Sequence, residues 1–154
     1  MFEFPHTVIL RHRKENLKKC SLRGLESRED LLFFSYPQDE LPPLSGYVLL
    51  ALDAPPLTKE DKNLGIFLID GTWRYAKTMF ESLKKPHLFE TRSLPAGFQT
   101  AYPRRQDENV DEKGGLASVE ALFLAYQILG RNTDGLLDHY HWKTPFLASL
   151  KKKE

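Results

Sequence analysis

The stretch Gly65–Ala76 carries the strongest chemical signal in the sequence. An apolar run there ends in Asp70 and a glycine, and a segment with helical spacing then opens with Thr72 and Trp73. Ligands of open α/β sheets bind outside the carboxyl ends of strands, where a helix N-terminus attracts a negative group such as a carboxylate. Asp70 would accept a hydrogen bond from a ligand amine or act as a general base, and Trp73 would line an apolar or cationic group. A capping aspartate and a core tryptophan explain the pattern equally well.

Two further stretches contain polar residues in patterns that suit binding. Tyr102 stands close to Arg104 and Arg105, which offer paired donors for phosphate beside a ring on which a base can stack. Salt bridges to the acidic residues that follow are the simpler explanation of these arginines. Ser118 and Glu120 open an otherwise apolar helical stretch. Glu120 suits the helix dipole there, so a structural role fits it at least as well as a catalytic role.

Basic residues also gather near the N-terminus. The chain has 22 Lys and Arg against 21 Asp and Glu, a formal net charge of +1, so any attraction to a nucleic acid must be local. One short segment with Glu15 as its only acid supplies a local excess: Arg11, His12, Arg13, Lys14, Lys18, Lys19 and Arg23. From charge alone, a solvated surface is a simpler explanation than an RNA contact.

The hydrophobic pattern predicts an α/β domain that would position these residues. Short apolar runs rich in β-branched and aromatic residues predict buried strands at Thr7–Leu10, Leu31–Ser35, Tyr47–Leu52 and Gly65–Asp70. Their near-continuous hydrophobicity favours a mostly parallel sheet covered by helices on both faces. Helices are predicted at Thr72–Lys85, at Ser118–Leu129 with Ser118 as the N-cap and Gly130 after the end, and at Thr133–Leu150, whole or broken at Pro145.

Length and composition fit one domain over residues 1–154, with residues 150–154 as a frayed tail. Hydrophobic residues make up 41% and charged residues 28% of the chain, as in ordinary globular proteins. The sequence has no membrane-spanning stretch and no secretory pattern, so we expect a cytoplasmic protein without membrane contact. It also lacks a paired-histidine metal motif, a glycine-rich phosphate loop and GxGxxG, and Cys20 is its only cysteine. We therefore expect no metal and no Rossmann-type cofactor site.

The order of four short motifs resembles a known enzyme family. The strings IDGTW, LP, AYPRR and SVEA occur in this order in the DTW-domain family of RNA aminocarboxypropyltransferases. The stretches Lys18–Ser21 and Trp142–Leu147 are similar to related enzymes that modify small-subunit ribosomal RNA. The resemblance implies a SPOUT-like fold with a C-terminal trefoil knot that holds S-adenosylmethionine. It also implies transfer of the 3-amino-3-carboxypropyl group to N3 of a uridine or pseudouridine, with release of methylthioadenosine.

The resemblance also implies roles for individual residues. Asp70 would orient or deprotonate the uracil N3, while Trp73 and Ala76 would pack around the methyl group of the cofactor and so prevent methyl transfer. Other residues matching cofactor positions are Ser21, Phe67, Thr72, Leu94, Leu116 and Ser118. RNA contacts are expected from Arg11, Arg13, Lys14, Lys18, Lys19, Arg23, Tyr102, Arg104 and Arg105.

Several alternatives stay open at this point. Transfer-RNA enzymes of the DTW family often carry an N-terminal cysteine cluster, whereas this chain has only Cys20, so both ribosomal and transfer RNA remain candidate substrates. A SPOUT methyltransferase would use the same cofactor, and a non-catalytic ribosome-assembly factor would bind RNA alone. We expect a monomer, although the uncharged stretch 121–129 would also suit a dimer interface.

Overall fold

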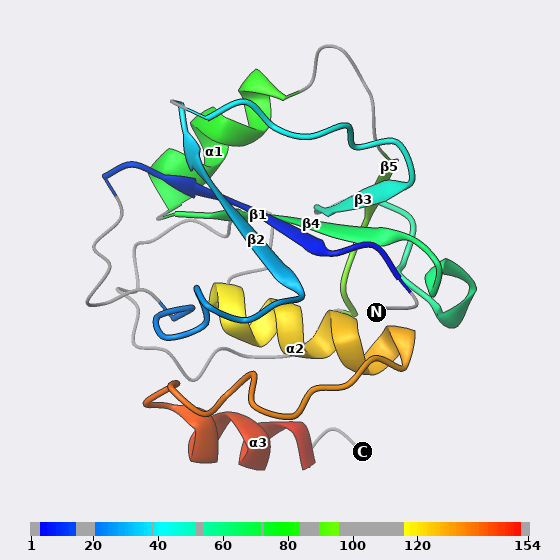
Figure 1. Cartoon of the computed structure of the whole chain (residues 1–154). Coiled ribbons are helices and arrows are strands. Elements are labelled where there is room, and N and C mark those ends of the chain that lie inside the picture. Colours follow the sequence, from blue (N-terminus) through cyan, green and yellow to red (C-terminus); the bar gives the residue numbers. More distant parts are fainter. Residues whose placement is uncertain are drawn as a thin grey trace.

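The computed structural model describes residues 4–14, 21–37, 39–51, 54–71, 73–83, 90–95 and 116–151, with residues 73, 74 and 76 described by their backbone alone. The centre of the fold is a five-stranded sheet in the order β2-β1-β4-β3-β5, and every neighbouring pair is parallel (Figure 1). The strands are β1 (Thr7–His12), β2 (Leu31–Tyr36), β3 (Tyr47–Leu50), β4 (Gly65–Asp70) and β5 (Glu90–Arg92).

The first four strands confirm the predictions from the hydrophobic pattern, with shifts of one or two residues at their carboxyl ends. Every residue of β1 and β4 is buried, which agrees with central strands of a sheet covered on both faces. The pattern missed β5, because Glu-Thr-Arg has no apolar run and belongs to an edge strand.

The helices lie in layers on either side of the sheet. Helix α1 (Trp73–Ser82) covers one face, whereas α2 (Ser118–Leu129) covers the other and separates the sheet from α3 (Lys143–Lys151) (Figure 1). A short 3-10 helix, η1 (Lys59–Asp61), precedes β4. Helix α3 packs through Phe146, whose ring meets Phe123 of α2 edge-on with centroids 5.8 Å apart. Within the described ranges, no helix combines the length and the hydrophobicity needed to cross a membrane.

Alternate residues of the central strands pack into two separate hydrophobic clusters, one on each face of the sheet. Ile9 and Leu68 point to the α2 side, whereas Leu10 and Phe67 point to the α1 side. The apolar helix α2 is therefore covered by the sheet on one side and by the C-terminal segment on the other. Its uncharged surface is explained within one chain.

The ends of α2 partly correct the predictions. Gly130 follows the helix with a φ of 72°, as expected for a glycine that ends a helix in the left-handed region. However, the N-cap is Ala117, and the predicted capping by Ser118 is wrong because its hydroxyl is donated to Asp70 instead. Glu120 accepts a hydrogen bond from the Ala117 N–H at 2.8 Å and another from the Tyr140 hydroxyl at 2.9 Å, which gives this buried carboxylate a structural role.

The C-terminal segment is helical only in its second half. The prediction of a helix starting at Thr133 is wrong, because residues 134–139 form turns and Gly135 has a φ of 83°. Pro145 does not break a helix. It lies in the first turn of α3, where backbone N–H groups have no helical partner and a residue without one fits.

Gly65, the first residue of β4, lies against an aromatic ring. A Cβ atom at this position would come within 2.4 Å of the Tyr47 ring. The Tyr47 hydroxyl donates to the carbonyl of His6 at 2.6 Å, which fixes the ring between the starts of β1, β3 and β4. The absence of a side chain at Gly65 is thus a packing requirement.

Candidate functional site

The sheet changes direction between β1 and β4. After β1 the chain passes to β2 on one side, with Leu22 and Leu25 packed on the α2 face; after β4 it passes through α1, on the opposite face, to β5 at the other edge. Doubly wound sheets generally bind their ligands outside the carboxyl ends of the strands at such a switch point. Arg11 and Asp70 are register partners at this place.

Asp70 is held by two donors of different kinds. Its side chain is almost fully buried, and its Oδ2 accepts a hydrogen bond from Arg11 Nε at 3.0 Å within an ion pair. Its Oδ1 accepts from the Ser118 hydroxyl at 2.7 Å. Gly71 then starts the turn into α1, where a Cβ atom would lie 3.3 Å from the Cβ of Tyr75. Asp70 is therefore fixed at the joint between β4, β1 and the start of α2.

Arg11 connects this aspartate to a second carboxylate. Its Nη1 donates to Glu26 Oε2 at 3.2 Å, and its guanidinium carbon lies 4.7 Å from the centre of the Phe33 ring. The other Glu26 oxygen accepts from the Gly24 N–H at 2.8 Å. Burial raises the pKa of Glu26, but hydrogen bonds from its own and the Gly24 backbone N–H and from Arg11 outweigh burial and lower it overall.

Two residues predicted from the resemblance, Ser21 and Leu116, lie at the start of α2. Ser21 Oγ accepts from the Val119 N–H at 3.1 Å, next to the bond between Ser118 and Asp70. Leu116, immediately before the helix, is buried, and Leu94 packs against the same hydrophobic cluster. Ser21 thus contributes an oxygen close to Asp70 and Ser118, whereas the side chain of Leu116 is part of the core and Leu94 is the partly exposed apolar residue of the set.

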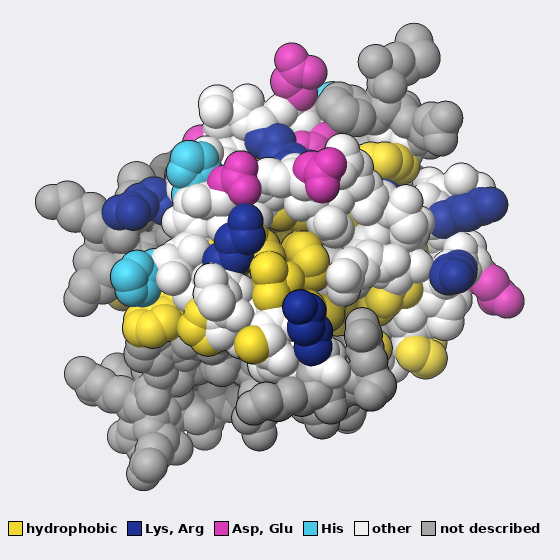
Figure 2. Space-filling view, turned by 90° about the horizontal axis from the view of Figure 1, so that it is seen from below, with side chains coloured by type: hydrophobic (Ala, Val, Ile, Leu, Met, Phe, Trp, Pro, Cys, Tyr) yellow, Lys and Arg dark blue, Asp and Glu magenta, His cyan; other side chains and the backbone are white. Residues whose placement is uncertain are grey.

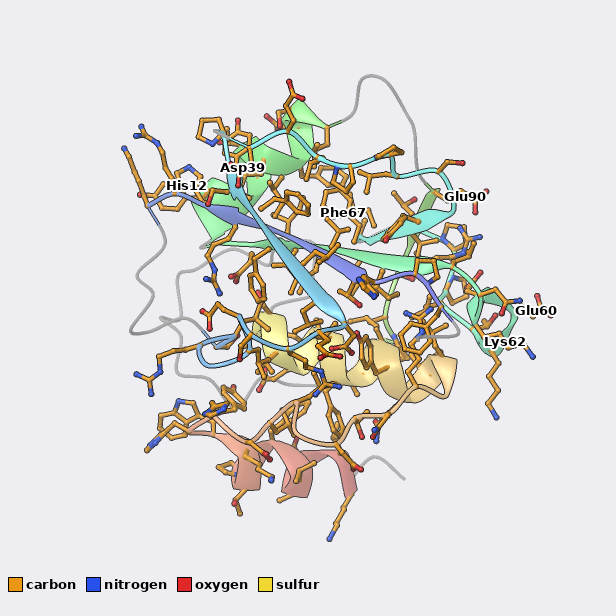
Figure 3. The ribbon with its side chains drawn as sticks, viewed as in Figure 1. His12, Asp39, Glu60, Lys62, Phe67 and Glu90 are labelled. Carbon is orange, nitrogen blue, oxygen red and sulfur yellow. The ribbon has the colours of Figure 1, made fainter. Side chains whose placement is uncertain are left out.

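The remaining predicted cofactor positions divide into two groups. Phe67 lies in the middle of the sheet on the α1 side, fully buried among core residues (Figure 3). Its side chain is thus a core element. Thr72 and the side chains of Trp73 and Ala76 lie outside the described residues.

The structure describes four of the nine predicted RNA contacts. Arg13, Lys14 and Arg23 are exposed, whereas Arg11 is buried beside Asp70. Others lie outside the described residues: Lys18, Lys19, Tyr102, Arg104 and Arg105. On the face below α3, Figure 2 shows basic side chains standing apart from one another among hydrophobic ones, so the described part of this face has no continuous basic surface.

Sequence reasoning gave no site role to Glu26 or His12. His12, labelled in Figure 3 at the end of β1, stacks on Tyr75 with centroids 3.9 Å apart and an interplanar angle of 8°. Its Nδ1 accepts from the Lys14 N–H at 3.1 Å, so the neutral ring carries its proton on Nε2. Burial lowers the pKa of His12, and the charges of Arg13 and Lys14 lower it further. Neither residue is revealed by local spacing, because their partners come from distant segments or from the backbone.

Another arginine–aspartate pair lies at the opposite end of the sheet, with Asp30 buried and Arg28 partly exposed. Arg28 Nε donates to Asp30 Oδ1 at 2.6 Å, and its Nη atoms donate to the backbone carbonyls of Asp134 at 2.8 Å and Asn132 at 3.3 Å. The other Asp30 oxygen accepts from the Tyr126 hydroxyl at 3.2 Å. Thr7 Oγ1 lies 2.6 Å from that hydroxyl and so completes a buried cluster, which we call the amino-end cluster.

Comparison with known proteins places the fold. No family model matches the chain, and no curated protein matches its sequence. Among solved structures, the fold is similar to that of the SAM-dependent rRNA:acp-transferase Tsr3 from Vulcanisaeta distributa. The TM-score is 0.73 and the sequence identity 23%, over 97% of this chain and 80% of that chain. This likeness shows a common fold and agrees with the single α/β domain built on a parallel sheet.

Proposed function

We propose that this chain transfers the 3-amino-3-carboxypropyl group of S-adenosylmethionine to N3 of a uridine or pseudouridine in RNA. The observation that carries the proposal is Asp70, held between Arg11 and Ser118 at the switch point of the sheet. The similarity of the fold to an rRNA:acp-transferase supports the same reading and favours ribosomal over transfer RNA.

The described residues fit the proposed donor. S-adenosylmethionine has a cationic sulfonium and an ammonium group, a carboxylate and an adenine ring, so it needs acceptors and apolar surface together. Asp70 and Ser21 supply oxygen acceptors, and the partly exposed Leu94 supplies apolar surface, whereas Leu116 is buried in the core and would contribute through its main chain. Ser118 and Thr72 are expected to complete this set, and Phe67 would contribute through its main chain because its side chain is buried in the core.

Asp70 is the group that we propose meets the substrate. A carboxylate accepts hydrogen bonds and can take up a proton, and this carboxylate is oriented by Arg11 and Ser118. In the proposed complex it accepts the N–H of the uracil N3. In this role Asp70 orients the base and receives or stabilises its proton.

Positioning decides the product in this chemistry. When bound, the donor supplies a sulfonium whose three neighbouring carbons are all electrophilic. The chain needs only to present one carbon to the base, which is a matter of orientation at short range. We assign Trp73 and Ala76 to enclosing the methyl group, so that the aminocarboxypropyl chain faces the RNA.

The finer parts of the resemblance belong to this proposal. Membership of the DTW-domain family, the SPOUT-like trefoil knot and the RNA contacts of Arg13, Lys14 and Arg23 are predictions. The knot depends on the course of the whole C-terminal half, and residues 96–115 lie outside the described part of the chain. We expect the protein to act as a cytoplasmic monomer without a metal ion.

Labelled donors test the proposal directly. The purified protein is incubated with total cell RNA and S-adenosylmethionine labelled either in the methyl group or in the carboxypropyl carbons. We expect the carboxypropyl label alone to enter RNA, with methylthioadenosine released, and fractionation then identifies the RNA. Entry of the methyl label alone would instead establish a methyltransferase.

A non-catalytic RNA-binding factor gives a third outcome. In that case neither label enters RNA, and the variants Asp70→Ala and Trp73→Ala bind RNA and support ribosome assembly like the wild type. For the proposed enzyme, both variants lose most of the transfer rate.

A further inference from the structure

Arg11 stands apart from the basic residues that surround it in the sequence. Its side chain is 11% exposed, whereas Arg13, Lys14 and Arg23 are exposed to solvent. Its Nε is bonded to Asp70, its Nη1 to Glu26, and one face of its guanidinium lies over Phe33. An RNA phosphate would have to displace a carboxylate to reach these nitrogens. This placement does not suit a surface contact with RNA.

Arg11 belongs to a ring of contacts, which we call the circuit, that is closed partly by hydrogen bonds and partly by the chain itself. The circuit runs from Glu26 to Arg11, from Arg11 to Asp70, and from Asp70 to Ser118. The next residue, Val119, donates its N–H to Ser21, which leads back along the chain to Glu26. The circuit thereby joins β1, β4, the start of α2 and the segment 21–26. A carboxylate within such a circuit has little freedom to rotate.

We infer that Arg11 is a positioning residue for Asp70 and that Glu26 in turn fixes Arg11; this inference rests on the proposed function. Arg11 donates its Nε–H to Asp70 Oδ2 at 3.0 Å and thereby orients the carboxylate that the proposed function places against the substrate. Its second bond, to Glu26, fixes the plane of the guanidinium. A planar group that bridges two carboxylates sets an angle as well as a distance, and a lysine cannot do both.

The test is a double-mutant cycle of Arg11→Met and Asp70→Asn, measured as the single-turnover transfer rate at saturating S-adenosylmethionine and RNA. Displacement of a catalytic group by about 1 Å can lower the rate by about 100-fold, and we expect a loss of this size for Arg11→Met. RNA affinity, measured separately by fluorescence anisotropy, should stay close to that of the wild type. Since Arg11 acts through Asp70, the double variant should be no slower than Asp70→Asn alone.

Arg28→Met is the matched control, because Arg28 also pairs with a buried aspartate but lies at the far end of the sheet. It should lower thermal stability and leave the transfer rate unchanged. Arg11→Lys should give an intermediate rate, since an ammonium restores a donor for Asp70 without bridging to Glu26. If Arg11→Met does not fold, Glu26→Gln is measured instead and should slow transfer less than Asp70→Asn, with RNA affinity unchanged.

Three results would overturn the inference. The first is weaker RNA binding by Arg11→Met with an unchanged saturating rate, which would make Arg11 an RNA contact. The second is a double variant slowed by the product of the two single effects, and the third is a folded Glu26→Gln variant with the wild-type rate. Failure of the proposed function is distinct, because the wild-type chain would then transfer no carboxypropyl label before any variant is compared.

Discussion

The two ends of the sheet each hold an arginine–aspartate pair, but the surroundings of the pairs differ. In the amino-end cluster, Arg28 also donates to two backbone carbonyls, and Asp30 also accepts a hydrogen bond from the Tyr126 hydroxyl. At the carboxyl end, the pair of Arg11 and Asp70 joins two strands and connects to Glu26, whose side chain is 44% exposed. Both pairs are therefore partly open to solvent, the first at Arg28, whose side chain is 21% exposed, and the second at Glu26, and they differ in the elements that they join.

This difference separates stability from function. Both pairs satisfy the same electrostatic requirement, since a buried carboxylate needs a cation and donors. Only the carboxyl-end pair lies at the switch point, beside the turn at Gly71 and the start of α2. A buried ion pair alone therefore does not identify a site; its position relative to the strand ends does.

The same substitution at both ends should give opposite results, and this is the largest effect we expect. Asp70→Asn should lower the saturating transfer rate by about 1000-fold, because a positioned acid–base group contributes about 10²- to 10⁴-fold. Asp30→Asn should leave that rate unchanged but lower the free energy of unfolding by about 3 kcal/mol, the cost of breaking a buried pair. Rates and urea denaturation are measured on both variants. Equal losses of transfer rate in Asp70→Asn and Asp30→Asn would contradict a catalytic role confined to the carboxyl end.

Tyr126→Phe probes the amino-end cluster without changing its charge. The hydroxyl lies between Thr7 and Asp30, so its loss leaves a buried polar group short of a partner and should destabilise the fold by about 2 kcal/mol. Denaturant unfolding at neutral pH measures this change. The transfer rate under folding conditions should equal that of the wild type, and a slowed variant would show that the amino end also serves catalysis.

Ser118→Ala probes the carboxyl end by one hydrogen bond. Loss of the donor to Asp70 Oδ1 should slow transfer by about tenfold, the rate equivalent of about 1.4 kcal/mol. Ser149→Ala is the matched control, because this serine also lies in a helix but donates to the carbonyl of Phe146 within α3. The control should keep the wild-type rate. Equal rates for the two variants would mean that Ser118 does not support Asp70.

The smallest expected effect is a pH dependence confined to the carboxyl end. The pKa of His12 is lowered from 6.5 in the folded chain, so the unfolded state binds more protons between the two pKa values. Stability from this group is present above pH 6.5 and is lost as the pH falls through the folded pKa. Burial raises the pKa of Tyr126, which therefore does not titrate near neutral pH.

His12→Gln should flatten the rise in unfolding free energy on the acidic side of pH 6.5. Denaturant unfolding at a series of pH values measures this slope for the wild type and the variant. His6→Gln is the comparison, because this histidine directly precedes β1 at the amino end of the sheet. A slope that stays unchanged in His12→Gln but falls in His6→Gln would contradict this assignment.

Local patterns were enough to predict most of the fold. The apolar runs of β1 and β4 and the glycine after α2 specify their elements through side chains and backbone angles that neighbours in the sequence determine. Strand β5 was not predicted, because Glu-Thr-Arg becomes a strand only by pairing with β3. Its structure comes from a tertiary contact, and no local preference signals it.

The candidate site was predictable in its centre and not in its connections. The position of Asp70 followed from a strand that ends before a glycine turn. By contrast, Ser118 was assigned to capping because spacing does not show which acceptor a hydroxyl meets. Arg11 was grouped with nearby basic residues because charge patterns do not show that one of them pairs with Asp70 across the sheet.

The close approach of Gly65 and Tyr47 has a consequence for the evolution of this protein. The ring of Tyr47 occupies the space that a side chain at position 65 would need. Among descendants of a common ancestor, the two positions should therefore change together: an alanine or larger residue at 65 should occur with a smaller residue at 47. Such a pair would also lose the bond from Tyr47 to the carbonyl of His6, so the start of β1 should vary along with them.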